Sequence, residues 1–273
     1  MKTKAVRIYG ANDIRLEEFE LPAIKEDEIL AEVISDSVCM STHKAVLQGP
    51  AHKRVPEDVA VNPTIIGHEF CGIIREVGAK WKDKYKPGDK FAIQPAMNYK
   101  GSLYAPGYSY RWIGGNSQFV VIPHEVMECD CLLHYDHDTY FYGSLAEPVS
   151  CIVGGYHCNY HATPGVYVHN MGIVEGGNTI LMAAAGPMGL EAIDYAIHCD
   201  RKPGLLVVTD IDSVRLKRAA SIHTVEEAEK NGVKLVYVNT NDVENAHDYL
   251  MELTGGKGYD DAFVYAPVKP VVE

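Results

Sequence analysis

The stretch "TILMAAAGPMGLEAIDYAIHC", residues 179–199, joins a short apolar run to a helical pattern through a turn that contains glycine. Gly186 and Gly189 occupy the second and third glycine positions of a dinucleotide-binding turn, and Ala184 stands at the first. Glycines at such a turn let the backbone bend sharply and approach a pyrophosphate, whose charge lies at the helix N-terminus. The predicted cofactor-binding residues of this turn are Gly186, Pro187, Met188 and Gly189.

The next apolar run, residues 205–210, ends in an acidic residue, Asp210, which follows Gly189 by 21 positions. A carboxylate at that place can accept hydrogen bonds from the adenosine ribose hydroxyls. Its charge would repel a ribose 2′-phosphate, so the sequence favours NAD(H) over NADP(H). Arg215 and Lys217 follow and should weaken that bias without removing it, which makes Arg215 a further predicted cofactor contact. The alternative is that Asp210 only caps a helix.

Strand-like runs continue to alternate with helical patterns after this point. Helical patterns cover 212–221 and 241–253, and strand-like runs cover 234–238 and 260–266. Repeated βα units indicate a parallel sheet, here a doubly wound Rossmann sheet. We expect the last run to lie beside the first, across the point where the strand order reverses.

The first part of the chain has a different pattern. From Lys4 to Pro123, short alternating runs are separated by Gly, Pro and Asp turns, which is typical of a β-rich domain. Residues 95–116, rich in Gly, Pro, Ser and Tyr, show neither strand nor helix periodicity and predict a long loop or lobe. The Gly-containing connection 165–177 predicts a domain boundary, which divides the chain into residues 1–164 and 165–273.

The charge balance argues against several classes of partner. The chain has 37 acidic and 25 basic residues, a formal charge of −12, and its densest basic group, residues 52–54, is short. Binding to nucleic acid or to an anionic membrane is therefore not expected. The N-terminus has no apolar signal region, and no apolar run approaches the roughly 18 residues of a membrane span. We expect a cytoplasmic protein whose partner is a small molecule.

Four side chains form a candidate metal site. The seven cysteines lack the spacing of a disulfide framework or a structural zinc site, but Cys39 precedes the pair His68 and Glu69, and Glu147 precedes a proline. A thiolate, an imidazole and carboxylates suit Zn²⁺, and catalytic zinc commonly has three protein ligands and one open position. Taken singly, each residue has an ordinary explanation as a core cysteine or a polar turn. The combination favours a metal site.

The order of these features resembles the zinc-dependent medium-chain dehydrogenase/reductase family across nearly the whole chain, and the Glu-Pro segment resembles its polyol and threonine dehydrogenase branch. The resemblance implies an α/β protein with a β-rich, GroES-like catalytic domain followed by a Rossmann domain. It implies that Cys39 and His68 bind one catalytic zinc ion, that Glu69 is a ligand or a close neighbouring carboxylate, and that Glu147 exchanges with zinc-bound water. It also implies a homo-oligomer, a dimer or tetramer.

Ser41 matches the family's hydroxyl that passes the substrate proton outward. Thr42 stands where the family usually has an aspartate, and Lys44 where it often has the histidine that ends the relay, with His43 one residue earlier. The exit of the proton therefore stays open between His43, Lys44 and solvent. Residues 95–116 lack the cysteine quartet that often binds a structural zinc, so one zinc per chain is expected. The predicted catalytic residues are Ser41, His43 and Glu69.

The resemblance implies an oxidoreductase that moves a hydride between a nicotinamide and a secondary alcohol or ketone, in particular a ketose phosphate and its polyol phosphate. Lys44, Lys100 and Arg111 are candidates for the phosphate site by residue type. Alternatives are a free-polyol dehydrogenase, an L-threonine dehydrogenase, or a noncatalytic fragment. The second half of the Rossmann sheet is not found in the sequence, so we expect a truncated domain and weak hydride transfer by residues 1–273 alone.

Overall fold

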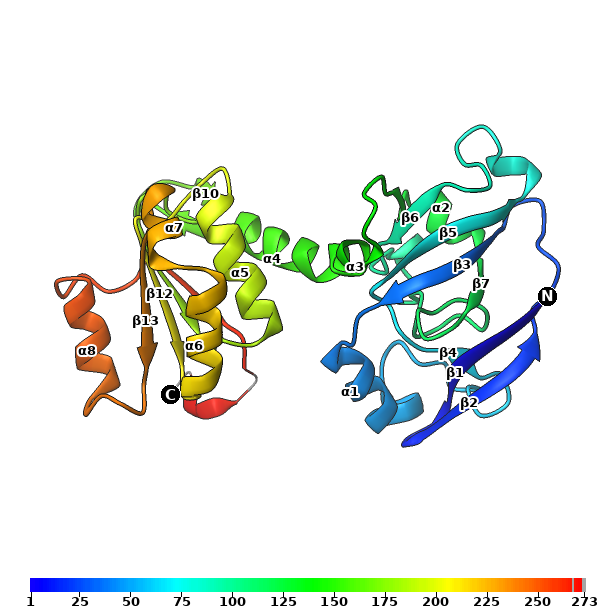
Figure 1. The fold of residues 1–273 in the computed structure, drawn as a ribbon, viewed down its shortest axis with the longest axis horizontal. Helices are drawn as coiled ribbons and strands as arrows, with labels where there is room; N and C mark the ends of the chain where they lie inside the picture. Colours follow the sequence, from blue (N-terminus) through cyan, green and yellow to red (C-terminus); the bar gives the residue numbers. More distant parts are fainter. Residues whose placement is uncertain (267, 272–273) are drawn as a thin grey trace. The chain divides into compact units, whose positions relative to one another are not determined.

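The chain divides into two compact units (Figure 1). This computed structural model describes residues 1–266 and 268–271, and its units comprise Met1–Pro148 and Val149–Glu273. The border between the two units lies within helix α4 (Ala146–Cys158). The domain boundary expected between residues 164 and 165 remains a prediction. In the described part of the chain, no helix has the length and apolar character needed to cross a membrane.

Antiparallel strands dominate the N-terminal unit. They are β1 (Lys2–Gly10), β2 (Asp13–Glu20), β3 (Ile29–Asp36), β4 (Thr64–Ile65), β5 (Phe70–Val77), β6 (Lys90–Ile93), β7 (Phe119–Ile122) and β8 (Leu132–His134). One sheet has the order β7-β3-β5-β6-β8 and another the order β2-β1-β4. The helices are α1 (Met40–Gln48), α2 (His124–Glu128) and α3 (Tyr140–Ser144), with short 3-10 turns η1 (Gly49–Ala51), η2 (Ala79–Trp81) and η3 (Tyr99–Gly101). The expected β-rich domain is confirmed.

The register of β3 and β5 positions the residues that follow and precede these strands. Asp36, the last residue of β3, pairs with Phe70, the first residue of β5. Gly72 allows the strands to approach closely, because a Cβ atom there would lie 1.9 Å from the carbonyl oxygen of Glu32. Since the strands are antiparallel, the chain that leaves β3 lies beside the chain that enters β5. Residues from positions 37–41 and 67–69 are thereby brought together.

The C-terminal unit is built on a parallel sheet. Its strands are β9 (Tyr160–Ala162), β10 (His169–Met171), β11 (Asn178–Met182), β12 (Leu205–Asp210), β13 (Lys234–Asn239) and β14 (Asp261–Val264). The helices after α4 are α5 (Pro187–His198), α6 (Ser213–Ile222), α7 (Val225–Lys230) and α8 (Ala246–Leu253), with a 3-10 turn η4 (Lys269–Val271). The parallel strands have the order β13-β12-β11-β14, and β9 and β10 form a separate antiparallel pair. The last strand pairs with the first, as expected, with Thr179 opposite Asp261.

Helices cover both faces of this sheet, which explains its continuous apolar runs. Leu206 and Val208 of β12 belong to the core that packs against α5 and α6, whereas Leu205 and Val207 belong to a second core on the other face. Leu250 of α8 packs against that second core. Figure 1 shows α5 and α6 on one side of the strands and α8 on the other. The Rossmann-type arrangement predicted from the sequence is confirmed.

Short helices differ most from the sequence-based expectation. The helix predicted over 241–253 begins only at Ala246, because the side chain of Asn245 caps it by accepting a hydrogen bond from the Asp248 N–H at 3.2 Å. Helix α7 was not predicted, and it begins after Thr224, whose hydroxyl accepts from the Glu227 N–H at 3.2 Å. Caps of single residues therefore set these helix boundaries.

The glycine turn between β11 and α5 contains two glycines with different physical roles. Gly186 is the residue that precedes α5, and a Cβ atom there would meet nothing within 4 Å. A Cβ atom on Gly189 would lie 1.9 Å from the carbonyl oxygen of Ala184, so only glycine lets the helix approach the strand. Ala183 has a φ of 54°, in the left-handed region that L-residues rarely adopt. Packing thus requires Gly189, while open space surrounds Gly186.

Alanine substitutions should separate these two roles. We expect Gly189→Ala to lower the free energy of unfolding by roughly 1–3 kcal/mol, because the new methyl group overlaps the backbone. Gly186→Ala is the matched control and should change it by no more than about 0.5 kcal/mol. Urea denaturation followed by circular dichroism measures both. Equal losses in the two variants would contradict the packing role of Gly189.

Candidate functional site

Three donor side chains converge in the N-terminal unit. One donor atom each from Cys39, His68 and Glu69 lies within 4.8 Å of the other two. Cys39 directly precedes helix α1, and His68 and Glu69 directly precede β5, so the β3–β5 register brings them together. His68 and Glu69 are 4% and 5% exposed, and Cys39 is half-buried. The sequence-predicted residues of the metal site thus meet, except for Glu147.

The chemistry of this donor set fits zinc. Burial lowers the pKa of His68, which keeps the imidazole neutral and its lone pair available. Burial also raises the pKa of the Cys39 thiol, whereas a coordinating metal ion would deprotonate it. A buried carboxylate is costly without a compensating cation, and sulfur, nitrogen and oxygen donors are the ligands that zinc accepts. Cys39, His68 and Glu69 could therefore hold a zinc ion.

Two hydroxyl groups orient the outer atoms of these donors. The Oγ1 atom of Thr42, on α1, lies 3.1 Å from Nδ1 of His68, so Nε2 is the nitrogen that faces the cluster. Ser37 donates its hydroxyl to the carboxylate of Glu69. Hydrogen bonds of this kind fix the tautomer and direction of a metal ligand. Thr42 thus supplies a neutral partner to the histidine where the resembling family usually has an aspartate.

Ser41 and Tyr108 lie at the centre of the cluster. The Ser41 hydroxyl lies 2.9 Å from Cys39 Sγ, 3.3 Å from His68 Nε2 and 2.7 Å from the Tyr108 hydroxyl. Tyr108 belongs to the predicted lobe, and its ring centroid lies 4.7 Å from that of His68. Burial raises the pKa of Tyr108 to about 12, so its hydroxyl stays neutral. Tyr108 could not be identified from the sequence, because no periodicity marks the lobe.

The remaining predicted residues of this unit lie around the cluster. His43 is exposed on α1, and in residues 1–266 and 268–271 the hydrogen bonds of the Ser41 hydroxyl do not include it. Glu147, on α4, is near enough for its charge to contribute to the raised pKa of Tyr108, whose main cause is burial. The roles of His43 in proton transfer and of Glu147 at the metal remain predictions.

In the C-terminal unit, Asp210 lies at the end of β12, as predicted, but its carboxylate also supports the turn. It accepts hydrogen bonds from the N–H groups of Ala185 at 3.0 Å, Ile211 at 2.8 Å and Asp212 at 3.1 Å. The cap of α6 is Asp212, which accepts from the backbone of Arg215 at 3.0 Å. The capping role considered for Asp210 therefore belongs to Asp212, and the exposed Arg215 also forms an ion pair with Asp212.

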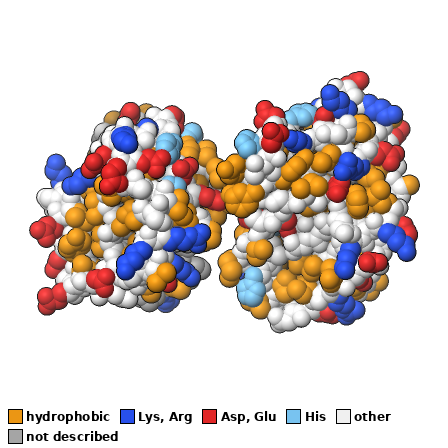
Figure 2. All heavy atoms as spheres, in the orientation of Figure 1, with side chains coloured by type: hydrophobic (Ala, Val, Ile, Leu, Met, Phe, Trp, Pro, Cys, Tyr) orange, Lys and Arg blue, Asp and Glu red, His pale blue; other side chains and the backbone are white. Residues whose placement is uncertain are grey.

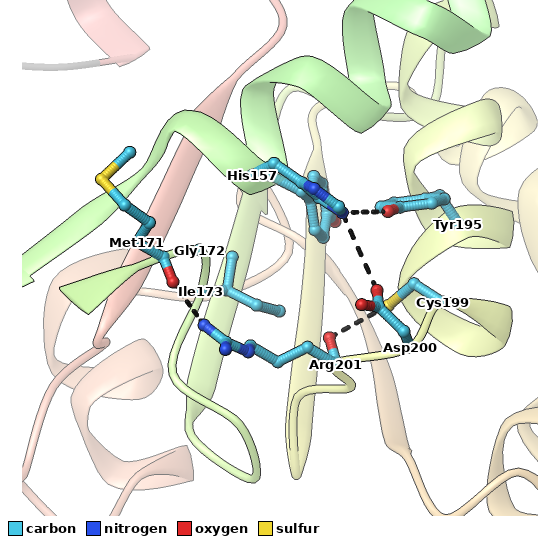
Figure 3. Close-up of a pocket in the computed structure, with 9 residues that line it drawn as sticks. His157, Met171, Gly172, Ile173, Tyr195, Cys199, Asp200 and Arg201 are labelled. Atoms are coloured by element: carbon cyan, nitrogen blue, oxygen red, sulfur yellow. Dashed lines mark hydrogen bonds and ion pairs between the residues drawn. The ribbon is translucent and has the colours of Figure 1, made fainter.

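A separate pocket of about 140 Å³ lies at the other end of α5 (Figure 3). The Nε2 atom of His157 lies 2.9 Å from the Tyr195 hydroxyl and 3.8 Å from the Asp200 carboxylate. Arg201 donates to the carbonyl oxygen of Met171. This pocket follows the C-terminus of α5, whereas the predicted pyrophosphate-binding turn precedes its N-terminus. It is therefore distinct from the predicted cofactor turn.

Comparison with known proteins gives the class of this fold and site. Residues 25–132 match the family of the alcohol dehydrogenase GroES-like domain. The structure also resembles that of 2R,3R-butanediol dehydrogenase from Bacillus subtilis, with a TM-score of 0.72 and 23% identity, over 99% of this chain and 72% of that one. Part of the N-terminal unit thus matches the alcohol dehydrogenase GroES-like domain, and the fold expected from the resemblance to medium-chain dehydrogenases is confirmed. Structures with this fold include complexes with NADP and with NADH.

Two relatives are similar over almost all of this chain. Mannitol-1-phosphate 5-dehydrogenase of Aliivibrio fischeri is 50% identical over 272 residues, which are 100% of this chain and 64% of the relative. L-sorbose 1-phosphate reductase of Klebsiella pneumoniae is 47% identical over 270 residues, 99% of this chain and 64% of the relative. The chain therefore spans less than two thirds of the length of these relatives.

We expect one zinc ion per chain. Cys39→Ala should remove most of it, because the thiolate is the softest donor of the set. Cys131→Ala is the matched control, since Cys131 is a cysteine of the same unit that lies in its hydrophobic core. Elemental analysis of the purified proteins measures the content. Two zinc ions per chain, or undiminished zinc in Cys39→Ala, would refute the assignment.

The hydrogen bond between Thr42 and His68 gives a second expectation. Thr42→Val keeps the shape of the side chain but removes the hydroxyl, and we expect zinc affinity to fall by roughly ten- to a hundredfold. Thr42→Ser retains the hydroxyl and should bind zinc like the native protein. Competition with a chelator of known affinity measures the change. Equal affinities for the valine and serine variants would show that the hydroxyl does not support the ligand.

Proposed function

We propose that the complete protein moves a hydride between a nicotinamide dinucleotide and a secondary alcohol or ketone of a sugar phosphate. The observation that carries the proposal is the convergence of Cys39, His68 and Glu69 within 4.8 Å in a GroES-like domain. The glycine turn before α5, with Gly186 surrounded by open space, supports the dinucleotide part. Donors for zinc and a turn suited to pyrophosphate are both needed for this chemistry.

The residues of the site have separate roles in this proposal. In this proposal Cys39, His68 and Glu69 hold the metal, and Glu147 is a further carboxylate that exchanges with water at that place. Bound zinc would supply Lewis acidity to the substrate oxygen, and the nicotinamide would supply or accept the hydride. In this proposal Ser41 passes the substrate proton, and the distances of its hydroxyl, 2.9 Å to Cys39 Sγ and 3.3 Å to His68 Nε2, support that role. His43 remains a candidate for the later part of the proton path.

The names of the two relatives favour a phosphorylated hexose substrate. We propose reduction of L-sorbose 1-phosphate to D-glucitol 6-phosphate, on the resemblance to the Klebsiella pneumoniae reductase. The Aliivibrio fischeri relative favours a second candidate, oxidation of mannitol 1-phosphate at carbon 5. A free-polyol or L-threonine dehydrogenase and a noncatalytic protein remain alternatives to be tested. The family resemblance alone supports a cytoplasmic homo-oligomer, either a dimer or a tetramer.

Asp210 supports a preference for NAD(H) over NADP(H). A carboxylate has about four acceptor positions, and three backbone N–H groups bind this one. The remaining capacity suits a ribose hydroxyl, whereas a 2′-phosphate would meet a negative charge. Arg215 is already paired with Asp212, which limits its ability to attract that phosphate. NADP(H) is therefore the weaker cofactor in this proposal.

A substrate panel tests the proposal on the complete protein. L-sorbose 1-phosphate, D-fructose 6-phosphate, L-sorbose, D-glucitol and L-threonine would each be assayed with both nicotinamide cofactors. We expect the highest kcat/KM for a ketose phosphate with NADH, because the phosphate adds charge-assisted hydrogen bonds and Asp210 disfavours a 2′-phosphate. Equal kcat/KM for phosphorylated and free ketose would contradict the substrate class. A dominant preference for NADPH would contradict the role of Asp210.

A further inference from the structure

A guanidinium group lies beside the tyrosine of the metal cluster. Arg54 is half-buried, and its Cζ atom lies 5.6 Å from the ring centroid of Tyr108. His52 stacks on the same ring, with centroids 5.7 Å apart and planes 9° apart. The Tyr108 hydroxyl, in turn, lies 2.7 Å from Ser41 and 3.3 Å from His68. Arg54 is therefore connected to the proposed reaction centre through one aromatic side chain.

The guanidinium of Arg54 lacks the partner that a buried cation usually has. Among the residues that the structure describes, Arg54 forms no ion pair with a carboxylate, and its Nε atom is buried without a hydrogen-bond partner. The arginines Arg15 and Arg75, by contrast, are paired with Asp13 and Glu32. A buried donor without a partner costs free energy. An anionic ligand with oxygen acceptors would supply the ion-pair partner that the guanidinium lacks.

The surroundings of Arg54 are positively charged, in a chain whose formal charge is −12. Burial is the main cause that lowers the pKa of His52, and the charges of Lys44, Arg54 and Lys53 lower it further. Lys44 is exposed on α1, the helix that also carries Ser41. Figure 2 shows basic and acidic side chains interspersed on the face that it presents.

We infer that Arg54, assisted by Lys44, binds the phosphate group of the substrate beside the metal cluster. The inference rests on the proposed function and specifies how that site selects a phosphorylated substrate. Arginine suits this task because its planar group donates two parallel hydrogen bonds to phosphate oxygens. Tyr108 lies next to the guanidinium through its ring and next to Ser41 through its hydroxyl, so a phosphate bound by Arg54 would lie close to the proposed reaction centre.

The other cations proposed from sequence are engaged elsewhere. The Lys100 ammonium lies 4.7 Å from the ring centroid of Tyr99. The guanidinium of Arg111 lies 4.5 Å from a Trp112 ring centroid and donates to the side chain of Asn62 at 3.3 Å. Neither contact involves a residue of the metal cluster. Of the three cations suggested by residue type, Lys44 is the one that remains in this inference.

Kinetics on the complete protein test the assignment. The quantity measured is the ratio of kcat/KM for L-sorbose 1-phosphate to kcat/KM for L-sorbose. For Arg54→Gln we expect this ratio to fall by roughly ten- to a hundredfold, because hydrogen bonds to a charged group are lost. Arg54→Lys should recover part of the ratio, because it keeps the charge but not the paired donors. Arg15→Gln is the matched control, since Arg15 is exposed and paired with Asp13. An unaltered ratio in Arg54→Gln would overturn the inference.

A binding measurement separates this inference from the proposed function. Calorimetric titration with inorganic phosphate and with D-glucitol 6-phosphate needs no turnover, and Arg54→Gln should weaken the binding of both by a similar factor. If no substrate is turned over, the proposed function fails, and a loss of phosphate binding in Arg54→Gln would still support the anion site. Unaltered phosphate binding would refute the site. A rise in the KM for NADH alone would instead assign Arg54 to the diphosphate of the cofactor.

Discussion

The close approach of a thiol, an imidazole and a carboxylate is the constraint on which the N-terminal unit depends. Electron-donating side chains do not gather in a protein interior without compensation, because the buried carboxylate among them is costly. Here Ser37 and Thr42 bind the outer atoms of Glu69 and His68, and the inner atoms point towards Cys39. The antiparallel register of β3 and β5 imposes this arrangement. The hydrogen bonds that stabilise the fold at this point also determine the chemistry of the site.

Much of the fold follows from local patterns, and the exceptions have a physical reason. A strand buried on both faces has a continuous apolar sequence, so β11, β12 and β13 were predictable. The glycine turn before α5 was predictable as well. Short helices were not, because their boundaries depend on single capping side chains such as Thr224 and Asn245. Helix α1 was also missed, since its sequence "MSTHKAVLQ" has one buried residue, Ala45, and a weak apolar face.

The site was predictable only where residue order carries the information. Cys39, His68 and Glu69 could be proposed together because their order resembles a family, and the structure brings their donor atoms together. Tyr108 could not, since it lies 40 residues from His68 in a segment without periodicity. The same is true of Arg54, because nothing in the sequence around a basic loop residue predicts which side chains it contacts. Contacts between loops arise from tertiary packing, which local patterns do not encode.

The hydrogen bonds of Asp210 have a consequence for protein engineering. Its carboxylate binds the N–H of Ala185 inside the glycine turn and also stands where cofactor selection is proposed to occur. If that proposal holds, turn shape and nucleotide choice depend on one side chain, and they cannot be altered independently. A redesign that replaced the charge to admit a different nucleotide would release a backbone N–H beside the strained Ala183. Cofactor exchange in this protein would require a second substitution that supplies a new acceptor for the turn.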